Sequence, residues 1–322
     1  MTSNYKEQQR DKAIKLIQSN MQIFDGKARG KFYGKEREFV LRENMNNLFA
    51  PIRVDVVEYF NRNNISWWGG SRPTGHVLSS QIACVNHLFQ VRNNQEAVIA
   101  ILKKINADFI GVLPIESDKF SPAYIQFEAV SDCDHLNEDG PTRGNNCTSV
   151  DALIYAIHKD DSKWLIPIEW KYTEFYDNQN KATEGCRKDP LNCKGKVRQK
   201  RYNQLICCSN QLKSENLSCY YYEPFYQLMR QTLWVEQMIA HKHQETIKGD
   251  NYLHVHVIPS GNTDLLEKIY KCSGMNMERT WRNHLRDQSK YLIISPQIIM
   301  SGLTSSTEYQ PLLNYLSVRY MD

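Results

Sequence analysis

The segment "IPIEWKYTE", residues 166–174, places a carboxylate and an ammonium group two positions apart in an apolar run. Alternate side chains of a strand share a face, so Glu169 and Lys171 would be neighbours on one face, with the apolar residues on the other. Asp151 lies in the preceding apolar segment, "SVDALIYAIH". A tight turn between the two segments would place Asp151 opposite Glu169 or Lys171, with Cβ atoms about 5 Å apart.

Two carboxylates that converge at this distance repel each other unless a cation lies between them. Mg²⁺ is bound by oxygen ligands at about 2.0–2.1 Å and keeps several waters. A neighbouring lysine orients or deprotonates an attacking water and stabilises charge that develops on a phosphate. Asp151, Glu169 and Lys171 therefore fit metal-assisted hydrolysis of a phosphodiester. The alternative is a salt-bridged strand pair on a solvated sheet face, which predicts that Lys171→Ala destabilises the protein. In the nuclease interpretation, the polar strand face should tolerate alanine at position 171 with a modest loss of stability.

Elements that would position these residues follow from periodicity and turn residues. The first hundred residues have helical spacing, with one long helix from Ser79 or Ser80, a natural N-cap, to about Asn106. Residues 123–174 alternate as three antiparallel strands. The predicted helices are 4–24, 36–50, 54–65, 79–106, 223–242, 263–272, 278–287 and 307–320, and the predicted strands are 123–130, 149–158, 164–174, 252–259 and 290–296.

An aspartate followed by Glu-x-Lys one hairpin later resembles the signature of the PD-(D/E)xK nuclease superfamily. Its core is a helix, three strands, a helix and a strand, and residues 79–259 follow that order. The blocks "FEAV", "PTRGNNCTSVDALI", "IEWKYTE" and "YEPFYQLMRQTL" are similar to a bacterial group of restriction endonucleases, over most of the chain after Trp67. The resemblance implies an α/β protein with a restriction-endonuclease-like core, as a nuclease-like domain (67–322) behind a helical N-terminal extension (1–66).

The resemblance assigns Asp151 and Glu169 as metal ligands and Lys171 as the catalytic lysine. It implies Mg²⁺ as cofactor, with Mn²⁺ as a substitute, and hydrolysis of DNA. Val150 precedes the aspartate where the family's name motif has proline. The competing interpretations are a non-catalytic nucleic-acid-binding module of this fold, and a nuclease that acts on RNA or branched DNA.

Many members of the superfamily add an acidic residue from the first helix. Here that helix holds Gln81 near its start and no glutamate before Glu96. Glu128, on the first predicted strand, is therefore our candidate for a further metal ligand and catalytic residue. Its alternative is a surface carboxylate on a strand.

Further residues are candidates for contacts around the reaction. On the helix after Glu-x-Lys, Gln227 and Gln231 share a face with Arg230 beside them. The nucleases that the sequence resembles carry a glutamine on this helix near the active site, so either glutamine is a candidate to bind substrate or a metal-bound water. The resemblance therefore implies a catalytic role for Gln227, and Arg230 and Gln231 are candidates for nucleic-acid binding. Lysines and arginines that neutralise phosphates supply most non-specific affinity for nucleic acid. The remaining candidates for that role are Arg143, Lys194, Lys196, Arg198, Lys200 and Arg201. The alternatives are a polar helix face and a solvated basic loop.

Composition sets the broad class. The chain has 322 residues and a mild net charge of +4, so charge alone does not demand an anionic partner. The nine cysteines contain no C-x₂-C pair, so we expect free thiols rather than zinc ligands. No apolar run is long enough to span a membrane, and the polar N-terminus lacks a signal region. We expect a cytoplasmic protein with DNA as its partner, no membrane, and a homodimer as one assembly compatible with the sequence.

Overall fold

A computed structural model describes residues 4–19, 23–24, 29–118, 121–140, 147–215 and 217–321. Its α-helices are α1 (Asn4–Gln18), α2 (Arg53–Arg62), α3 (Ser80–Leu88), α4 (Gln95–Ile105), α5 (Lys194–Cys208), α6 (Phe225–Ala240), α7 (Thr263–Leu266), α8 (Met277–His284), α9 (Pro296–Met300) and α10 (Gln310–Tyr320). Its strands are β1 (Gly30–Phe32), β2 (Lys35–Arg37), β3 (Phe109–Val112), β4 (Glu116–Asp118), β5 (Ser121–Ala123), β6 (Ile125–Ala129), β7 (Val150–His158), β8 (Lys163–Trp170), β9 (Asn251–Tyr252), β10 (His254–Val257) and β11 (Tyr291–Ile294).

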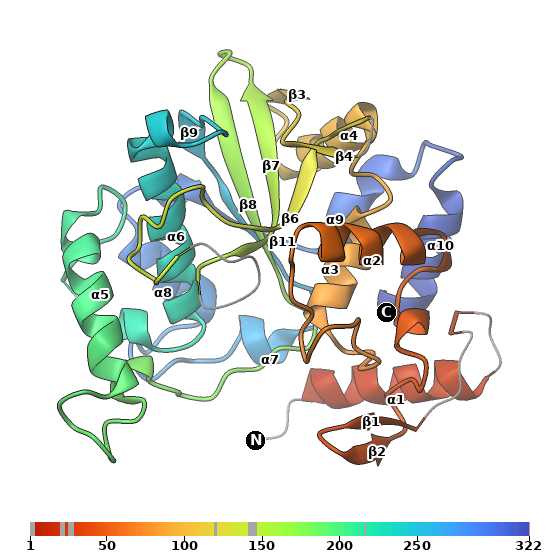
Figure 1. The fold of residues 1–322 in the computed structure, drawn as a ribbon, viewed down its shortest axis with the longest axis horizontal. Coiled ribbons are helices and arrows are strands. Elements are labelled where there is room, and N and C mark those ends of the chain that lie inside the picture. The colour runs from red at the N-terminus through yellow and green to blue at the C-terminus, as the bar shows by residue number, and fades with distance from the viewer. Residues whose placement is uncertain are drawn as a thin grey trace.

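A mixed sheet lies at the centre of the molecule (Figure 1). Its strand order is β11-β10-β8-β7-β3, with β6 also paired to β7 and β9 to β8. Strands β6, β7 and β8 are antiparallel, whereas β10 runs parallel to both β8 and β11. Ala152 of β7 pairs with Phe127 of β6 and Ile168 of β8, which fixes the register of the three antiparallel strands.

Helices cover both faces of the sheet (Figure 1). Ile166, Ile168 and Trp170 of β8 belong to the hydrophobic core that α2, α3, α4 and α10 complete, whereas Leu165 belongs to the core formed with α6 and α8. This alternation is the period-two pattern of a strand with helices on either side. The protein is therefore an α/β protein in which even the more polar face of β8 is covered.

The three predicted antiparallel strands are confirmed as β6, β7 and β8, and α6, β10, α8, β11 and α10 overlap the segments predicted for them. The helix predicted over 263–272 is shorter, because α7 ends at Leu266, and α9 was not predicted. The single helix predicted over 79–106 is wrong, because α3 ends at Leu88 and α4 starts at Gln95. Ser79 caps α3 by accepting a hydrogen bond from the Ile82 amide, as expected. Asn94 caps α4 in the same way, and this second cap is the signal for a new helix.

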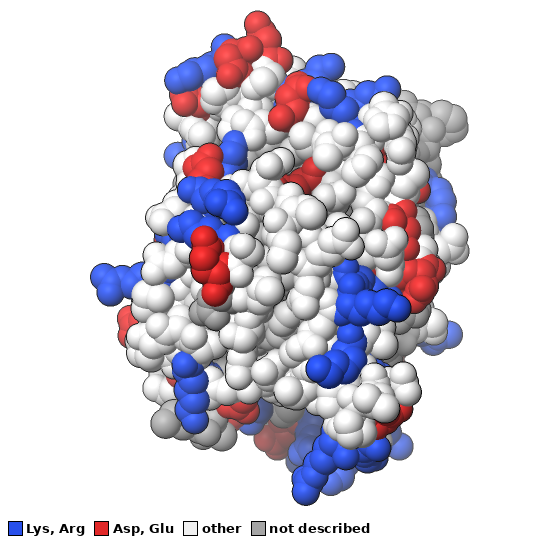
Figure 2. Space-filling model, turned by 90° about the vertical axis from the view of Figure 1, so that its left-hand side faces the viewer, with Lys and Arg blue, Asp and Glu red and all other residues white. Residues whose placement is uncertain are grey.

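Two further expectations are corrected. The helix predicted over 36–50 is absent from the described structure, where β1 and β2 form a hairpin and a 3₁₀ turn follows at Asn44–Asn47. The basic stretch that begins at Lys194 is a helix, α5, rather than a loop. Helix α5 lies on the outside of the molecule, on the side that Figure 2 views. Its buried residues Tyr202 and Ile206 share a face at i and i+4, which anchors it on α6.

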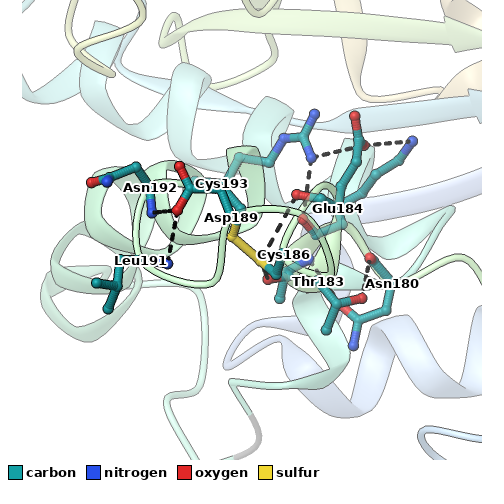
Figure 3. Close-up of a disulfide and its surroundings, with 11 residues drawn as sticks. Asn180, Thr183, Glu184, Cys186, Asp189, Leu191, Asn192 and Cys193 are labelled. Atoms are coloured by element: carbon teal, nitrogen blue, oxygen red, sulfur yellow. Dashed lines mark hydrogen bonds and ion pairs between the residues drawn. A yellow bond between two sulfur atoms is a disulfide. The ribbon is translucent and has the colours of Figure 1, made fainter.

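Two of the cysteines are not free thiols. Cys186 and Cys193 form a disulfide between the 3₁₀ turn at Lys181–Thr183 and the start of α5 (Figure 3). At the same junction Gly195 packs so closely that a Cβ there would overlap the Ala182 carbonyl. The first turn of α5 is therefore fixed to the preceding segment by a covalent bond and by close backbone contact.

The residues before Trp67 share one hydrophobic core with residues after it. Ala13, Phe60 and Leu41 pack in the same cluster as Ile168 and Leu316. The division of the chain at residue 66 stays a prediction. Within the described residues, no helix combines the length and the apolarity needed to span a membrane.

Candidate active site

A pocket of about 570 Å³ opens where β6 and β8 end and β7 begins. Glu128, Asp151 and Glu169 each lie one residue from the paired row at Ala152, so they form the next row across three adjacent strands. All three carboxylates line the pocket together with Lys171. The parity predicted from the sequence is therefore observed, and the two strands of the hairpin bring the aspartate and the Glu-x-Lys residues to one site.

Glu169 is buried under α6 and is held by three donors. Its Oε1 accepts hydrogen bonds from Lys171 Nζ at 2.5 Å and from Gln227 Nε2 at 2.7 Å. Its Oε2 accepts from Gln231 Nε2, which also contacts the Ser149 carbonyl oxygen. The i and i+4 spacing of the two glutamines thus places both amides on this carboxylate. Gln231, expected to bind nucleic acid, instead lies inside the protein.

Lys171 is buried with Glu169, with side chains that are 5% and 4% exposed respectively. Its ammonium group also donates to Gln227 Oε1 at 2.6 Å. Burial alone would lower the pKa of Lys171, but the neighbouring negative charges, Glu169 foremost, raise the pKa well above its ordinary value. The solvated sheet face of the alternative interpretation is therefore wrong, and the burial of Lys171 removes the ground on which a modest stability loss was expected for alanine.

Asp151 is partly exposed and lines the pocket. Its Oδ2 accepts a 2.6 Å hydrogen bond from the Trp170 amide, the one hydrogen bond of this side chain within the described part of the chain. Burial, followed by the negative charges of Glu169 and Glu128, raises the pKa of Asp151 well above its usual range. The neighbouring carboxylates therefore disfavour the charged form of Asp151 when no cation is bound.

Glu128 occupies an unusual backbone position within β6. Its φ of 47° lies in the left-handed region, which non-glycine residues seldom adopt. Its Oε1 accepts a 2.7 Å hydrogen bond from Gln81 Nε2 and its Oε2 accepts from Ser149 Oγ. Backbone strain of this kind is concentrated at functional sites. Gln81 of α3 thus touches the acidic row at the place where the sequence lacks an acidic helix residue.

The donor set of the pocket matches a hard divalent cation. Mg²⁺ is usually held by one or two carboxylates together with waters and substrate phosphates, rather than by a cage of protein ligands. Asp151 and Glu169 supply such carboxylates, and a cation would relieve the repulsion that raises the Asp151 pKa. No group of three or more His, Cys, Asp or Glu side chains in the described structure is arranged to hold a metal ion, so Glu128 as a third metal ligand stays a prediction.

Sequence reasoning missed two other parts of the site. The N-terminal segments supply Phe32, Tyr33, Trp68 and His76 to the rim of the pocket. Their signal in the sequence was the aromatic residues beside glycine on either side of residues 36–65. His256 of β10 pairs with Glu169 of β8 and is fully buried. Its pKa is lowered well below the ordinary value by burial and then by the Lys171 charge, so the imidazole is neutral.

The basic residues of α5 are divided between two faces. Arg198 and Lys194 face Glu184, and Arg201 faces Asp139. Lys196 and Lys200 are exposed and form no ion pair within the described residues. On the face of the molecule that Figure 2 shows, Lys and Arg side chains lie in separate groups with Asp and Glu among them. Of the five basic residues predicted to bind nucleic acid, the helix therefore offers two lysines that form no ion pair within the described residues.

Arg230 belongs to a buried polar cluster. Its Nε donates to Glu138 Oε1 at 3.2 Å and to Thr148 Oγ1 at 3.0 Å, and Tyr202 also donates to Glu138. Burial opposes the charge of Arg230, yet Tyr202 and Glu138 raise its pKa. This cluster joins α5 and α6 to the segment before β7. Arg143 lies outside the described residues.

The fold and the pocket define an α/β protein with an acidic, lysine-containing site at the end of a three-stranded antiparallel unit. The family model described as "Restriction Endonuclease associating with ARP" matches residues 10–321. The chain belongs to this family. No curated protein and no solved structure matches the chain.

Proposed function

We infer that the protein is a Mg²⁺-dependent endonuclease of the PD-(D/E)xK class that hydrolyses DNA phosphodiester bonds. The observation that carries this proposal is the convergence of Asp151, Glu169 and Lys171 in one open pocket, with Glu128 beside them. The order of α3, the antiparallel β6-β7-β8 unit, α6 and the parallel strand β10 supports it, and so does the description of the family.

Each group of the site has a distinct role in this proposal. Asp151 and Glu169 would hold the cation, which supplies Lewis-acid activation of water and neutralises phosphate charge. Lys171 is fixed by Glu169 and Gln227, so its ammonium protons point in defined directions before substrate arrives. A preorganised donor of this kind stabilises charge that develops on the phosphate. Gln227 and Gln231 hold Glu169 in place without adding charge.

A carboxylate-rich pocket repels phosphate, so the substrate must be attracted by other groups. Lys196 and Lys200 on α5 are two exposed cations that suit this role, because counterion release from phosphates supplies non-specific affinity. Arg230 is omitted from this set because the buried Glu138 already binds it. Arg198 and Arg201 each face a carboxylate and would contribute less.

The test is Mg²⁺-dependent nicking of a supercoiled plasmid by the parent protein and by Lys171→Met. We expect the parent to nick only when Mg²⁺ or Mn²⁺ is present. Removal of one such donor typically lowers the rate by about 10²–10³-fold. Lys163→Met is the matched control, because this exposed lysine lies at the other end of the same strand and should leave the rate unchanged. A parent protein without metal-dependent cleavage of plasmid, linear duplex or single-stranded DNA would remove the proposal.

A further inference from the structure

The rim of the candidate active site is aromatic. Among the described residues, Tyr33 and Trp68 are the two exposed aromatic side chains, 87% and 45% exposed respectively. Both line the same pocket as the carboxylates and Lys171. The chain has 11 Phe, 6 Trp and 18 Tyr residues, so the position of both exposed rings at one cavity is a feature to explain.

Both rings lie in tight turns, and the turn at Tyr33 has a conformational cost. Tyr33 and Gly34 form the two-residue turn between β1 and β2, with φ values of 48° and 75°. Such a turn favours asparagine or glycine at the tyrosine position, so an exposed ring there gives the fold no evident benefit. Trp68 lies in a second tight turn, which is closed by the Trp67–Gly70 bridge.

Phe32 supports the two rings from behind. Its ring centroid lies 4.4 Å from that of Tyr33 and 5.5 Å from that of Trp68. His76 packs on Phe32 at 4.7 Å and on Trp68 at 5.6 Å. The exposed rings are thus the outer layer of a packed aromatic cluster rather than isolated side chains.

Two hydrogen bonds connect the aromatic turn to the acidic row. The Trp68 amide donates to Gln81 Oε1 at 2.8 Å, and Gln81 Nε2 donates to Glu128 Oε1 at 2.7 Å. The position of Trp68 relative to the carboxylates is therefore fixed through one side chain. A planar group stacked on this tryptophan would lie beside the candidate catalytic groups.

The hairpin around Tyr33 is also basic. Residues 29–42 contain five Lys and Arg residues and two Glu residues. Lys31, Lys35 and Arg37 are exposed on the hairpin itself. Aromatic faces combined with a basic surface are the chemistry that binds unpaired nucleotides, because every base has a face that stacks and each nucleotide carries a phosphate.

We propose that Tyr33 and Trp68 form a stacking platform for one unpaired base of the nucleic-acid substrate, next to the scissile phosphate. The inference rests on the proposed function, because it takes this pocket as the place of cleavage. The base comes either from a single strand or from a duplex that extrudes it. In both cases the enzyme acts at a position where the nucleotide is not stacked on its neighbours.

Binding by fluorescence anisotropy tests the platform separately from cleavage. The full chain is titrated onto labelled DNA with Ca²⁺ in place of Mg²⁺, and a gel verifies that the DNA stays intact. Four probes of one sequence are compared: a paired duplex, the duplex with one bulged thymine, the duplex with an abasic residue at the bulge, and the single strand. Stacking of one base predicts about 5- to 150-fold tighter binding of the bulged probe than of its abasic counterpart.

The variants assign the preference to the platform. We expect Trp68→Ala to bring the ratio of bulged to abasic affinity close to one, and Trp68→Phe to retain most of it. Ile269→Ala, which shortens another exposed apolar side chain, should leave the ratio unchanged. Tyr33→Ala should lower the ratio as well, and because both rings are exposed these variants are expected to fold.

Two results would overturn the platform: equal affinity of the parent for the bulged and abasic probes, or a preference that survives Trp68→Ala. Tighter binding of the single strand than of the bulged duplex would identify the single strand as the source of the base, and the reverse would identify an extruded base. A Trp68-dependent preference in a protein without Mg²⁺-dependent cleavage would support the platform while removing the nuclease proposal. Cleavage without base preference would leave the nuclease proposal intact and reject the platform.

Discussion

Replacement of Lys171 by methionine removes an ammonium group that lies 2.5 Å from Glu169 Oε1 in the protein interior. Breaking a buried ion pair by removing one partner typically costs about 3–5 kcal/mol, because the other charge stays buried without compensation. Glu169 would keep the amide hydrogen bonds of Gln227 and Gln231, so we expect a loss near the lower end, about 3 kcal/mol. This is a larger loss than a polar, solvated strand face would give.

A second substitution, Glu169→Gln, tests whether the loss of stability comes from an unpaired buried charge rather than from lost packing. In the double variant Lys171→Met/Glu169→Gln no buried charge lacks a partner, and a neutral pair often replaces a buried ion pair at little cost. The double variant should therefore be more stable than the sum of the two single effects predicts, by about 1–3 kcal/mol, as expected for residues in direct contact. The free energy of unfolding is measured by urea denaturation, followed by circular dichroism, with Lys163→Met as the exposed control. A loss below about 1 kcal/mol for Lys171→Met, or additive single effects, would refute the buried-pair reasoning.

Three further predictions use other parts of the structure. Arg230→Met should destabilise the protein in urea denaturation by up to about 3 kcal/mol, because it removes the cation beside the buried Glu138, which keeps the hydrogen bonds from Thr148 and Tyr202. The DNA affinity of the folded protein should stay the same. A loss of affinity without a loss of stability would make Arg230 a phosphate ligand instead. The pair Lys196→Gln and Lys200→Gln should weaken binding to unrelated DNA sequences alike and reduce the slope of log affinity against log salt by about one per lysine, and an unchanged slope would place α5 outside the interface. Burial lowers the pKa of His87 to about 3, so below about pH 6.5 the unfolded chain binds a proton at this residue and the folded protein does not; the free energy of unfolding therefore falls as pH falls from about 6.5. His87→Leu should reduce this fall between about pH 6 and pH 4 by up to about 1.4 kcal/mol per pH unit. An unchanged pH profile of the unfolding free energy would contradict a neutral buried imidazole.

The position of the carboxylate row was predictable because strand parity leaves little freedom. A slip of one residue in the pairing of the two strands would turn every side chain of one strand to the opposite face of the sheet. Asp151 would then leave the face of Glu169, and the apolar side chains of its strand would leave the cores that they fill. The apolar alternation of β8 therefore fixed the position of Glu169 and Lys171 relative to that aspartate. The burial of these groups was not predictable, because it depends on α6, a helix that follows more than fifty residues after Lys171 in the sequence.

Helix α5 and the β1–β2 hairpin show where local patterns mislead. The buried large side chains of α5 are Tyr202 and Ile206, and the charged residues around them give the segment the composition of a solvated loop. In the hairpin, Tyr33 stands where a turn prediction looks for asparagine or glycine. The disulfide between Cys186 and Cys193 was likewise not predictable from the sequence, because cysteine spacing does not determine connectivity.

The nicking rate of Asp151→Asn with Mg²⁺ tests the central claim most directly. Asparagine can still accept the hydrogen bond from the Trp170 amide, and it removes the repulsion from Glu169 and Glu128. We therefore predict a melting temperature equal to or above that of the parent, together with a loss of cleavage of at least about 100-fold. An Asp151→Asn protein that melts like the parent and nicks the plasmid at the parent's rate would contradict the account, because the carboxylate row would then have no part in catalysis.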